Sequence, residues 1–176
     1  MPDIKSNEID TARFFVIVIY ENENDLINSL SVIEKKIQKY DYVSPNIVFH
    51  KTALIPVSKA NNPMGKIISF PKIYLIKEFS NFALNILKQK NYLLKKKKSH
   101  IFLIPGFVNS YQVAAAYKEF KSNRLQIYPN IFCQVELTFE SNKCMPGIYT
   151  SYEFSENKSL AFFSDVRRLY FSSIQF

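Results

Sequence analysis

The stretch Ser99–Phe139 constrains the fold more than any other part of the chain. Within it, Ile131–Phe139 alternates apolar and polar residues, which is typical of a β-strand with two different faces. The preceding Pro129-Asn130 suits a turn, so Arg124–Tyr128 is predicted to be the other arm of a hairpin. We expect the core face of the second arm to carry Ile131, Cys133, Val135, Leu137 and Phe139, and the other face to carry Phe132, Gln134, Glu136 and Thr138.

The first part of this stretch predicts two further elements. Ile101–Ile104 is expected to be a buried strand that ends at Pro105-Gly106. Gln112–Tyr117 is expected to be a short helical segment.

The N-terminal part of the chain carries the clearest strand and helix signals. Phe14–Tyr20 is an unbroken run of β-branched and aromatic residues, as in a central strand that is buried on both faces. Asn22–Asp25 suits a helix start, and apolar residues follow it at helical spacing. These residues are Leu26, Leu30, Ile33 and Ile37, with the helix ending at Tyr40-Asp41.

Six further segments complete the pattern. We expect an edge strand over Tyr42–Phe49, interrupted by Pro45, and a loop over residues 50–66. Ile67–Leu75 is predicted to be a strand, or two short pieces broken at Pro71, and a helix follows to about Tyr92. The segment 142–152 is expected to be a loop. A last helix is predicted from Leu160, Phe163, Val166 and Tyr170, with Ser155 as its cap.

The order of these elements predicts an α+β fold. Its core is a ferredoxin-like β-α-β-β-α-β arrangement, to which an antiparallel hairpin and a C-terminal helix are added. The length of 176 residues suits one hydrophobic core and is short for two. We therefore expect a single domain over residues 13–176, preceded by a flexible N-terminus over residues 1–12.

The composition limits the classes of function. The net charge of +8 suits a nucleic acid or an anionic surface, but Lys95–Lys98 alone supply four of these charges. The longest apolar run, Phe14–Tyr20, is far below the roughly 20 residues of a membrane-spanning helix, so we expect a cytoplasmic protein. Cys133 and Cys144 form neither a disulfide framework nor a metal motif, so we expect no metal and no cofactor.

One motif resembles a catalytic one. His50-Lys51-Thr52 is similar to the His-x-Thr motif of the two-histidine phosphoesterases. Those enzymes need two such motifs that face each other, and the second histidine, His100, has no hydroxyl residue two positions further on. We therefore predict no catalytic histidine.

The order of landmarks from Phe14 to Tyr170 resembles the bacterial domain-of-unknown-function family 4416. The landmarks are Met64-Gly65 ahead of Ser69-Phe70, Pro105-Gly106 after a strand, the strand Ile131–Leu137, and Phe162-Phe163, Arg167 and Tyr170 near the end. This resemblance covers nearly all of the chain and implies no established activity.

The departures from the family pattern concern its polar positions. The family has an Asp before Pro-Gly, an Arg and a Glu in the hairpin, and an Asp in a later aromatic segment. Those positions here are Ile104, Gln126, Gln134 and Ser151. An isoleucine neither binds a metal nor moves a proton, so the losses favour a binding or interaction protein without enzymatic activity. Arg124 and Glu136 lie two residues from two of the lost groups and share their strand faces.

The resulting candidate site has two parts. The candidate ligand pocket comprises Gly106, Arg124, Gln134, Glu136, Tyr149, Tyr152 and Arg167. The candidate contacts for an anion or a nucleic acid are Lys95, Lys96, Lys97 and Lys98. Two alternative functions stay open, namely a weak nucleic-acid binder that uses this basic loop, and an enzyme that acts on a phosphorylated substrate through His50 and Arg124.

Overall fold

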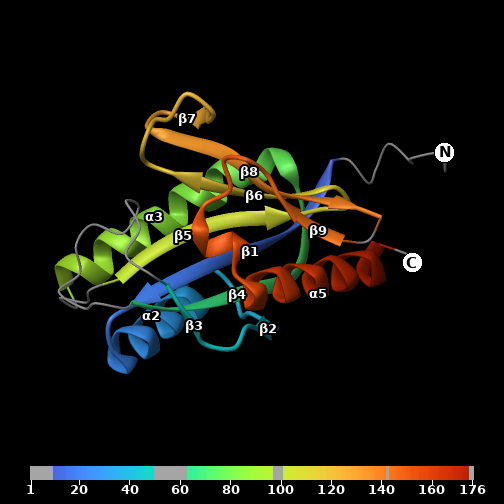
Figure 1. The fold of residues 1–176 in the computed structure, drawn as a ribbon. Coiled ribbons are helices and arrows are strands. Elements are labelled where there is room, and N and C mark those ends of the chain that lie inside the picture. The colour runs from blue at the N-terminus through green and yellow to red at the C-terminus, as the bar shows by residue number, and fades with distance from the viewer. Residues whose placement is uncertain (1–9, 50–62, 97–100, 142, 175–176) are drawn as a thin grey trace.

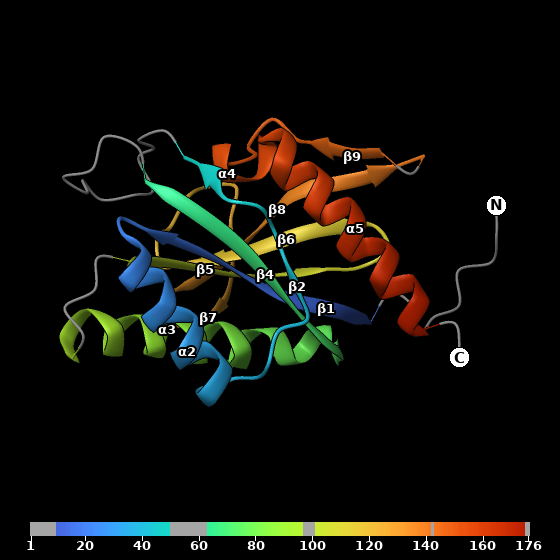
Figure 2. The ribbon, with the colours of Figure 1, turned by 90° about the horizontal axis from the view of Figure 1, so that it is seen from below.

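The protein folds into three layers, with one antiparallel sheet between helices on both of its faces (Figures 1 and 2). The computed structural model describes residues 10–49, 63–96, 101–141 and 143–174. Helices α2 (Glu23–Lys36) and α3 (Phe79–Lys96) lie side by side on one face, and α5 (Asn157–Ile174) lies on the other. We refer to these as the α2/α3 face and the α5 face.

The sheet has nine strands in the described residues, and every described strand pair is antiparallel. Its spatial order is β2 (Tyr42–Val43), β4 (Met64–Leu75), β1 (Thr11–Tyr20), β5 (Ile101–Val108), β6 (Gln112–Tyr117), β8 (Ile131–Glu140) and β7 (Leu125–Tyr128). Two more short strands attach at the sides: β3 (Ile47–Val48) pairs with β4, and β9 (Lys143–Pro146) pairs with β8. The predicted mixture of helices with an antiparallel sheet is therefore confirmed.

Strand β1 is the centre of the molecule, as its apolar run predicts. Its residues are buried from Ala12 to Tyr20, and alternate side chains enter different clusters. Phe14 and Val16 pack under α2 and α3, whereas Phe15 and Ile17 pack under α5. The unbroken apolar run follows from helices covering both faces of this strand.

Both helices of the α2/α3 face start near their predicted positions. Asn22 caps α2, since its side-chain oxygen accepts a hydrogen bond from the backbone N–H of Asp25 at 3.0 Å. This helix ends at Lys36, before the predicted stop at Tyr40. Helix α3 follows the short 3-10 helix η1 (Ile76–Glu78) and continues past Tyr92 to Lys96.

The predicted helix over Gln112–Tyr117 is wrong, because this segment is strand β6. It lies between β5 and β8 and pairs with both. Three consecutive alanines raise helix propensity, but propensity is weak against sheet pairing on two sides. The alternation is present all the same: Ala114 faces α3, whereas Val113 and Ala115 face α5.

Two strands extend beyond their predicted ends. Pro105-Gly106 does not end the fourth predicted strand, and β5 continues to Val108, with Pro105 opposite Val16 of β1. Strand β4 begins at Met64, inside the predicted loop over residues 50–66, of which residues 50–62 lie outside the described part. Pro71 does not break β4, because the register with β1 shifts between Arg13 and Phe15 and leaves Pro71 unpaired there.

The predicted hairpin is confirmed as β7 and β8, and Asn130 in its turn has a φ of 59°. The predicted faces of β8 are partly wrong. Leu137 pairs with Val113 and Val135 with Ala114, so Glu136 is the extra residue of a β-bulge. Because of this bulge, β8 has Cys133 and Val135 on the α2/α3 face but Leu137 on the α5 face.

The predicted C-terminal helix is present as α5, and it covers the second face of the sheet. Phe163, Val166 and Tyr170 are buried along it, but Ser155 is not its cap. Ser155 ends the short helix α4 (Tyr152–Ser155), and its hydroxyl donates to the carbonyl of Tyr152. The predicted loop over residues 142–152 contains strand β9. No helix of the described residues is long and apolar enough to cross a membrane.

Candidate functional site

Part of the predicted ligand pocket is a compact polar cluster on the α5 face. Arg124, Gln134 and Glu136 come together there, with Tyr117 and Ser151 as further members. These five residues are called the polar cluster below. Tyr117 was missed because its segment had the composition of a helix, and Ser151 was noted only as a position at which the family has an acid.

Arg124 is a buried member of the polar cluster, with 6% of its surface exposed. Its Nε donates to the side-chain oxygen of Gln134 at 3.1 Å, and its Nη1 donates to the carbonyl of Glu119 at 3.0 Å. The guanidinium lies 3.8 Å from the centre of the Tyr117 ring, in cation–π geometry. Its Nη2 is buried and has no hydrogen-bond partner among the described residues.

Glu136 is a buried carboxylate with several donors around it. It accepts hydrogen bonds from the Tyr117 hydroxyl, from the Ser151 N–H at 2.7 Å and from the Ser151 hydroxyl at 3.2 Å. Burial nevertheless raises the pKa of Glu136, against the lowering by these donors and by Arg124. Burial and the nearby Glu136 raise the pKa of Tyr117 well above its ordinary value, so Tyr117 keeps its proton and remains the donor.

The polar cluster fastens one segment of chain to the sheet. Gln134 donates to the carbonyl of Tyr149 at 2.5 Å, and the hydroxyl of Thr150 donates to the carbonyl of Glu136. These bonds lie where β8 pairs with β6 on one edge but has no partner strand on its other edge, between the part that pairs with β7 and the part that pairs with β9. The cluster therefore closes a gap in the edge of the sheet, and none of its members lines the cavities described below.

The raised pKa of Glu136 predicts a pH dependence of stability. Glu136 binds its proton more tightly in the folded chain than in the unfolded chain. Its full contribution to stability is therefore present at pH values below the ordinary glutamate pKa. That contribution is lost as pH rises through the raised pKa of the folded state. We expect the fall in unfolding free energy with rising pH to be smaller in Glu136→Gln than in the wild type. Urea unfolding from pH 4 to pH 8 measures both slopes, and equal slopes would contradict the assignment.

The other predicted pocket residues lie away from the polar cluster. Gly106 sits in β5, where an added Cβ would collide with the ring of Phe15. The hydroxyl of Tyr152 donates to Glu156. Arg167 donates to the carbonyl of Ser110 at 3.0 Å and lines a separate cavity of about 370 Å³. The predicted pocket residues are thus divided among the polar cluster, β5, α4 and α5.

The predicted basic loop falls largely outside the described residues. Lys95 is exposed at the end of α3, and Lys96 belongs to this helix, but its side chain is not described. Lys97, Lys98 and His50 lie outside the described part. The geometry of a basic-loop site, or of a site with His50, is therefore not tested.

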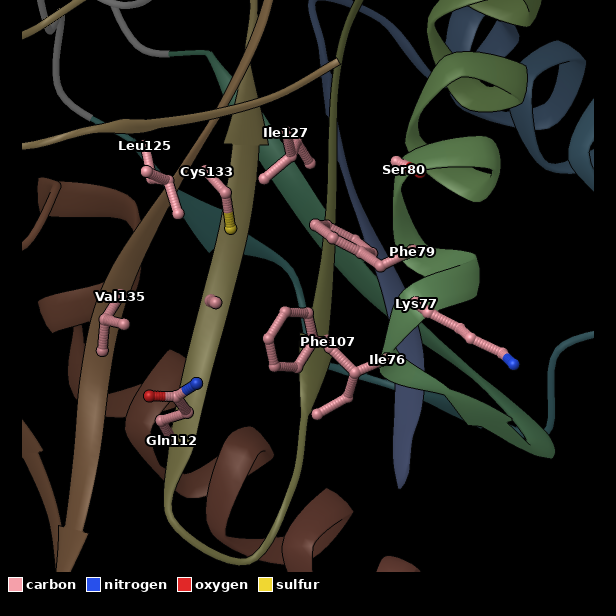
Figure 3. A pocket seen from close by; sticks show the side chains of 11 residues that line it. Ile76, Lys77, Phe79, Ser80, Phe107, Gln112, Leu125, Ile127, Cys133 and Val135 are labelled. Carbon is pink, nitrogen blue, oxygen red and sulfur yellow. The ribbon is translucent and has the colours of Figure 1, made fainter. Parts of the chain in front are cut away.

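A groove lies on the α2/α3 face, where the sheet extends beyond α3 (Figure 3). Its volume is about 420 Å³, and the start of α3 forms one side of it. Strands β6, β7 and β8 form the floor and the other side (Figure 3). Its lining includes the apolar side chains of Phe79, Phe107, Leu125, Ile127, Cys133 and Val135. We call this site the outer groove.

The outer groove is apolar and open. Leu125 is 74% exposed and Val135 is 46% exposed, although both are large apolar side chains. The ammonium group of Lys77 points away from the groove in Figure 3. Burial raises the pKa of the Cys133 thiol to about 12, so it is not a nucleophile at neutral pH. The outer groove is therefore equipped for contact with apolar groups and not for covalent chemistry.

The described residues contain no group of three or more His, Cys, Asp or Glu able to hold a metal ion.

The sequence model of one protein family, described as a domain of unknown function (DUF4416), matches residues 10–170. No curated protein and no solved structure matches the chain.

Proposed function

Because the chain belongs to the uncharacterised family DUF4416, whose description names no activity, we propose a function from the geometry alone. We propose that the protein is a binding protein without enzymatic activity, and that it docks a protein partner in the outer groove. The observation that carries this proposal is an apolar groove whose rim residues, Leu125 and Val135, remain exposed.

An open groove favours a protein partner over a small ligand. Small-ligand pockets enclose most of their ligand and add a few polar groups that converge on it. The outer groove has an exposed rim instead, and burying each large apolar side chain there contributes about 1.5–3 kcal/mol.

The stretch of sequence that supplies the groove's rim is rich in other exposed apolar side chains. Residues 120–149 supply more than half of the exposed large apolar side chains in the described part of the chain. Such concentrations are typical of protein interaction surfaces. Besides the two rim residues, the exposed side chains in this range are Phe120, Tyr128, Met145, Ile148 and Tyr149.

The polar cluster has a supporting role in this proposal. It ties Tyr149 and Thr150 to β8, and so it holds the apolar side chains of that segment in place beside the hairpin. Arg124, Gln134 and Glu136, which were predicted to line a ligand pocket, are thus proposed to hold part of an interaction surface in position.

Finer features of the fold belong to the same proposal. We propose that β1, α2, β2, β3, β4, α3 and β5 form a ferredoxin-like unit, supported by the strand order β2-β4-β1-β5 with both helices on one face. A single domain is proposed that includes Thr11 and Ala12, because both residues belong to β1 and pair with β4. We place the protein in the bacterial cytoplasm, a location that suits its free cysteines.

An apolar dye tests whether the outer groove is available to a partner. We expect the fluorescence of anilinonaphthalene sulfonate to rise with the wild-type protein and to rise several-fold less with Leu125→Glu/Val135→Glu. The matched control is Ile27→Glu, because Ile27 is 61% exposed on α2 and does not line the groove. Urea unfolding shows that the variants are folded. An unchanged dye signal in the double variant would contradict the proposal.

A further inference from the structure

A second cavity follows the outer groove along the same side of α3. It has a volume of about 220 Å³ and lies between α3 and the turn of the β7–β8 hairpin. Apart from Phe79 at its first position, the α3 residues that line the two cavities are spaced so that they share one helix face. They are Ser80 in the outer groove and Leu84, Leu87, Lys88 and Asn91 in the second cavity.

The second cavity is positively charged. Lys88 and Lys118 line it, and no described acidic residue does. A third lysine, Lys90, lies close enough for Lys118 to add to the lowering of its pKa by burial, whereas Glu119 opposes this lowering. We call Lys88, Asn91 and Lys118 the basic end of the surface beside α3.

The dimensions of this surface match a helix. Strands β6, β8 and β7 lie about 4.8 Å apart and so present a strip roughly 10–14 Å wide, and a helix with its side chains is about 10–12 Å across. From Ser80 to Asn91 the surface extends for about 16 Å, at 1.5 Å per helical residue. A helix placed there would continue the layer that α2 and α3 already form (Figure 2).

We propose that the partner presents an amphipathic helix that lies alongside α3, with its apolar face on the outer groove and acidic residues at the basic end. This inference rests on the proposed docking function and names its partner. The apolar contacts supply most of the binding, and the two lysines select the direction and charge of the helix.

Two synthetic helical peptides of about 14 residues test this inference. Both carry leucines at positions i, i+3 or i+4, and i+7. One ends in two glutamates and the other ends in two lysines. Fluorescence anisotropy is expected to show about tenfold tighter binding of the acidic peptide, because two exposed ion pairs contribute about 0.2–1 kcal/mol each. This advantage is expected to shrink at high salt.

The variant Lys88→Ser/Lys118→Ser is expected to remove the preference for the acidic peptide. Its matched control is Lys35→Ser/Lys36→Ser, in the last turn of α2, which is expected to keep the preference. Leu125→Glu/Val135→Glu is expected to weaken the binding of both peptides, because it changes the apolar part of the surface.

The remaining outcomes separate the two proposals. If the two peptides bind equally well, the proposal that the partner helix carries acidic residues is overturned. Failure of both peptides to bind, with a dye signal that still depends on Leu125 and Val135, overturns the helical partner and leaves the docking function standing. A dye signal independent of those residues overturns both proposals. If a labelled oligonucleotide binds through Lys88 and Lys118 without any effect of Leu125→Glu, the basic end belongs to a nucleic-acid site and the inference is overturned.

Discussion

Replacing Phe163 with alanine is expected to lower the free energy of unfolding by about 3–5 kcal/mol. Phe163 is a fully buried residue of α5, and its ring centre lies 4.9 Å from that of Phe15, 5.5 Å from that of Phe154 and 5.5 Å from that of Phe162. Three surrounding rings cannot collapse into the space that the truncated side chain leaves. The expected loss therefore includes a cavity term as well as the lost apolar burial.

Urea unfolding measures this loss, and Phe120→Ala is the matched control. Phe120 is 72% exposed, so the same chemical change is expected to cost under about 1 kcal/mol there. If the two variants lose equal stability, the aromatic cluster does not hold α5 on the sheet.

Replacing Gly106 with alanine is expected to cost about 1–3 kcal/mol, although the change adds a single methyl group. The new Cβ would lie 2.6 Å from the carbonyl oxygen of Ala114 and would overlap the ring of Phe15. Gly106 lies in β5, which pairs with β1 on one side and β6 on the other, so its backbone has little freedom to move away.

Gly147→Ala is the matched control for this prediction. Its added Cβ would meet no atom closer than the hydroxyl of Thr150 at 3.8 Å, so its effect is expected to stay within about 0.5 kcal/mol. Thermal or urea unfolding of both variants compares the two positions. Equal stabilities of Gly106→Ala and Gly147→Ala would show that the sheet repacks around β5.

The predictable parts of the fold are those whose apolar residues follow a pattern that fits only one type of secondary structure. The apolar run Phe14–Tyr20 and the helical spacing from Leu26 to Ile33 each suit one structure only, and the fold contains both. The run Ala114–Ala116 has no such contrast, because alanine suits a helix as well as a strand that is packed closely on both faces. Pairing with β5 and β8 made this segment a strand, and its own residues carry no pattern that indicates such pairing.

The candidate site was predictable to a similar extent. Arg124, Gln134 and Glu136 meet because alternate positions of paired strands share a face, which spacing alone shows. Their burial was not predictable, because it depends on the bulge at Glu136 and on the segment that crosses β8. The outer groove could not be predicted at all. It exists because the sheet is wider than the two helices on that face, a property of the assembled layers.

The bulge at Glu136 has a consequence for how this protein diverges among its relatives. On one side of the bulge β8 supplies residues to the outer groove, and on the other side it supplies residues to the core under α5. Substitutions at Cys133 and Val135 therefore alter the outer groove while the packing around Leu137 stays the same. A single strand thus allows the proposed docking surface to change without a change in the core under α5.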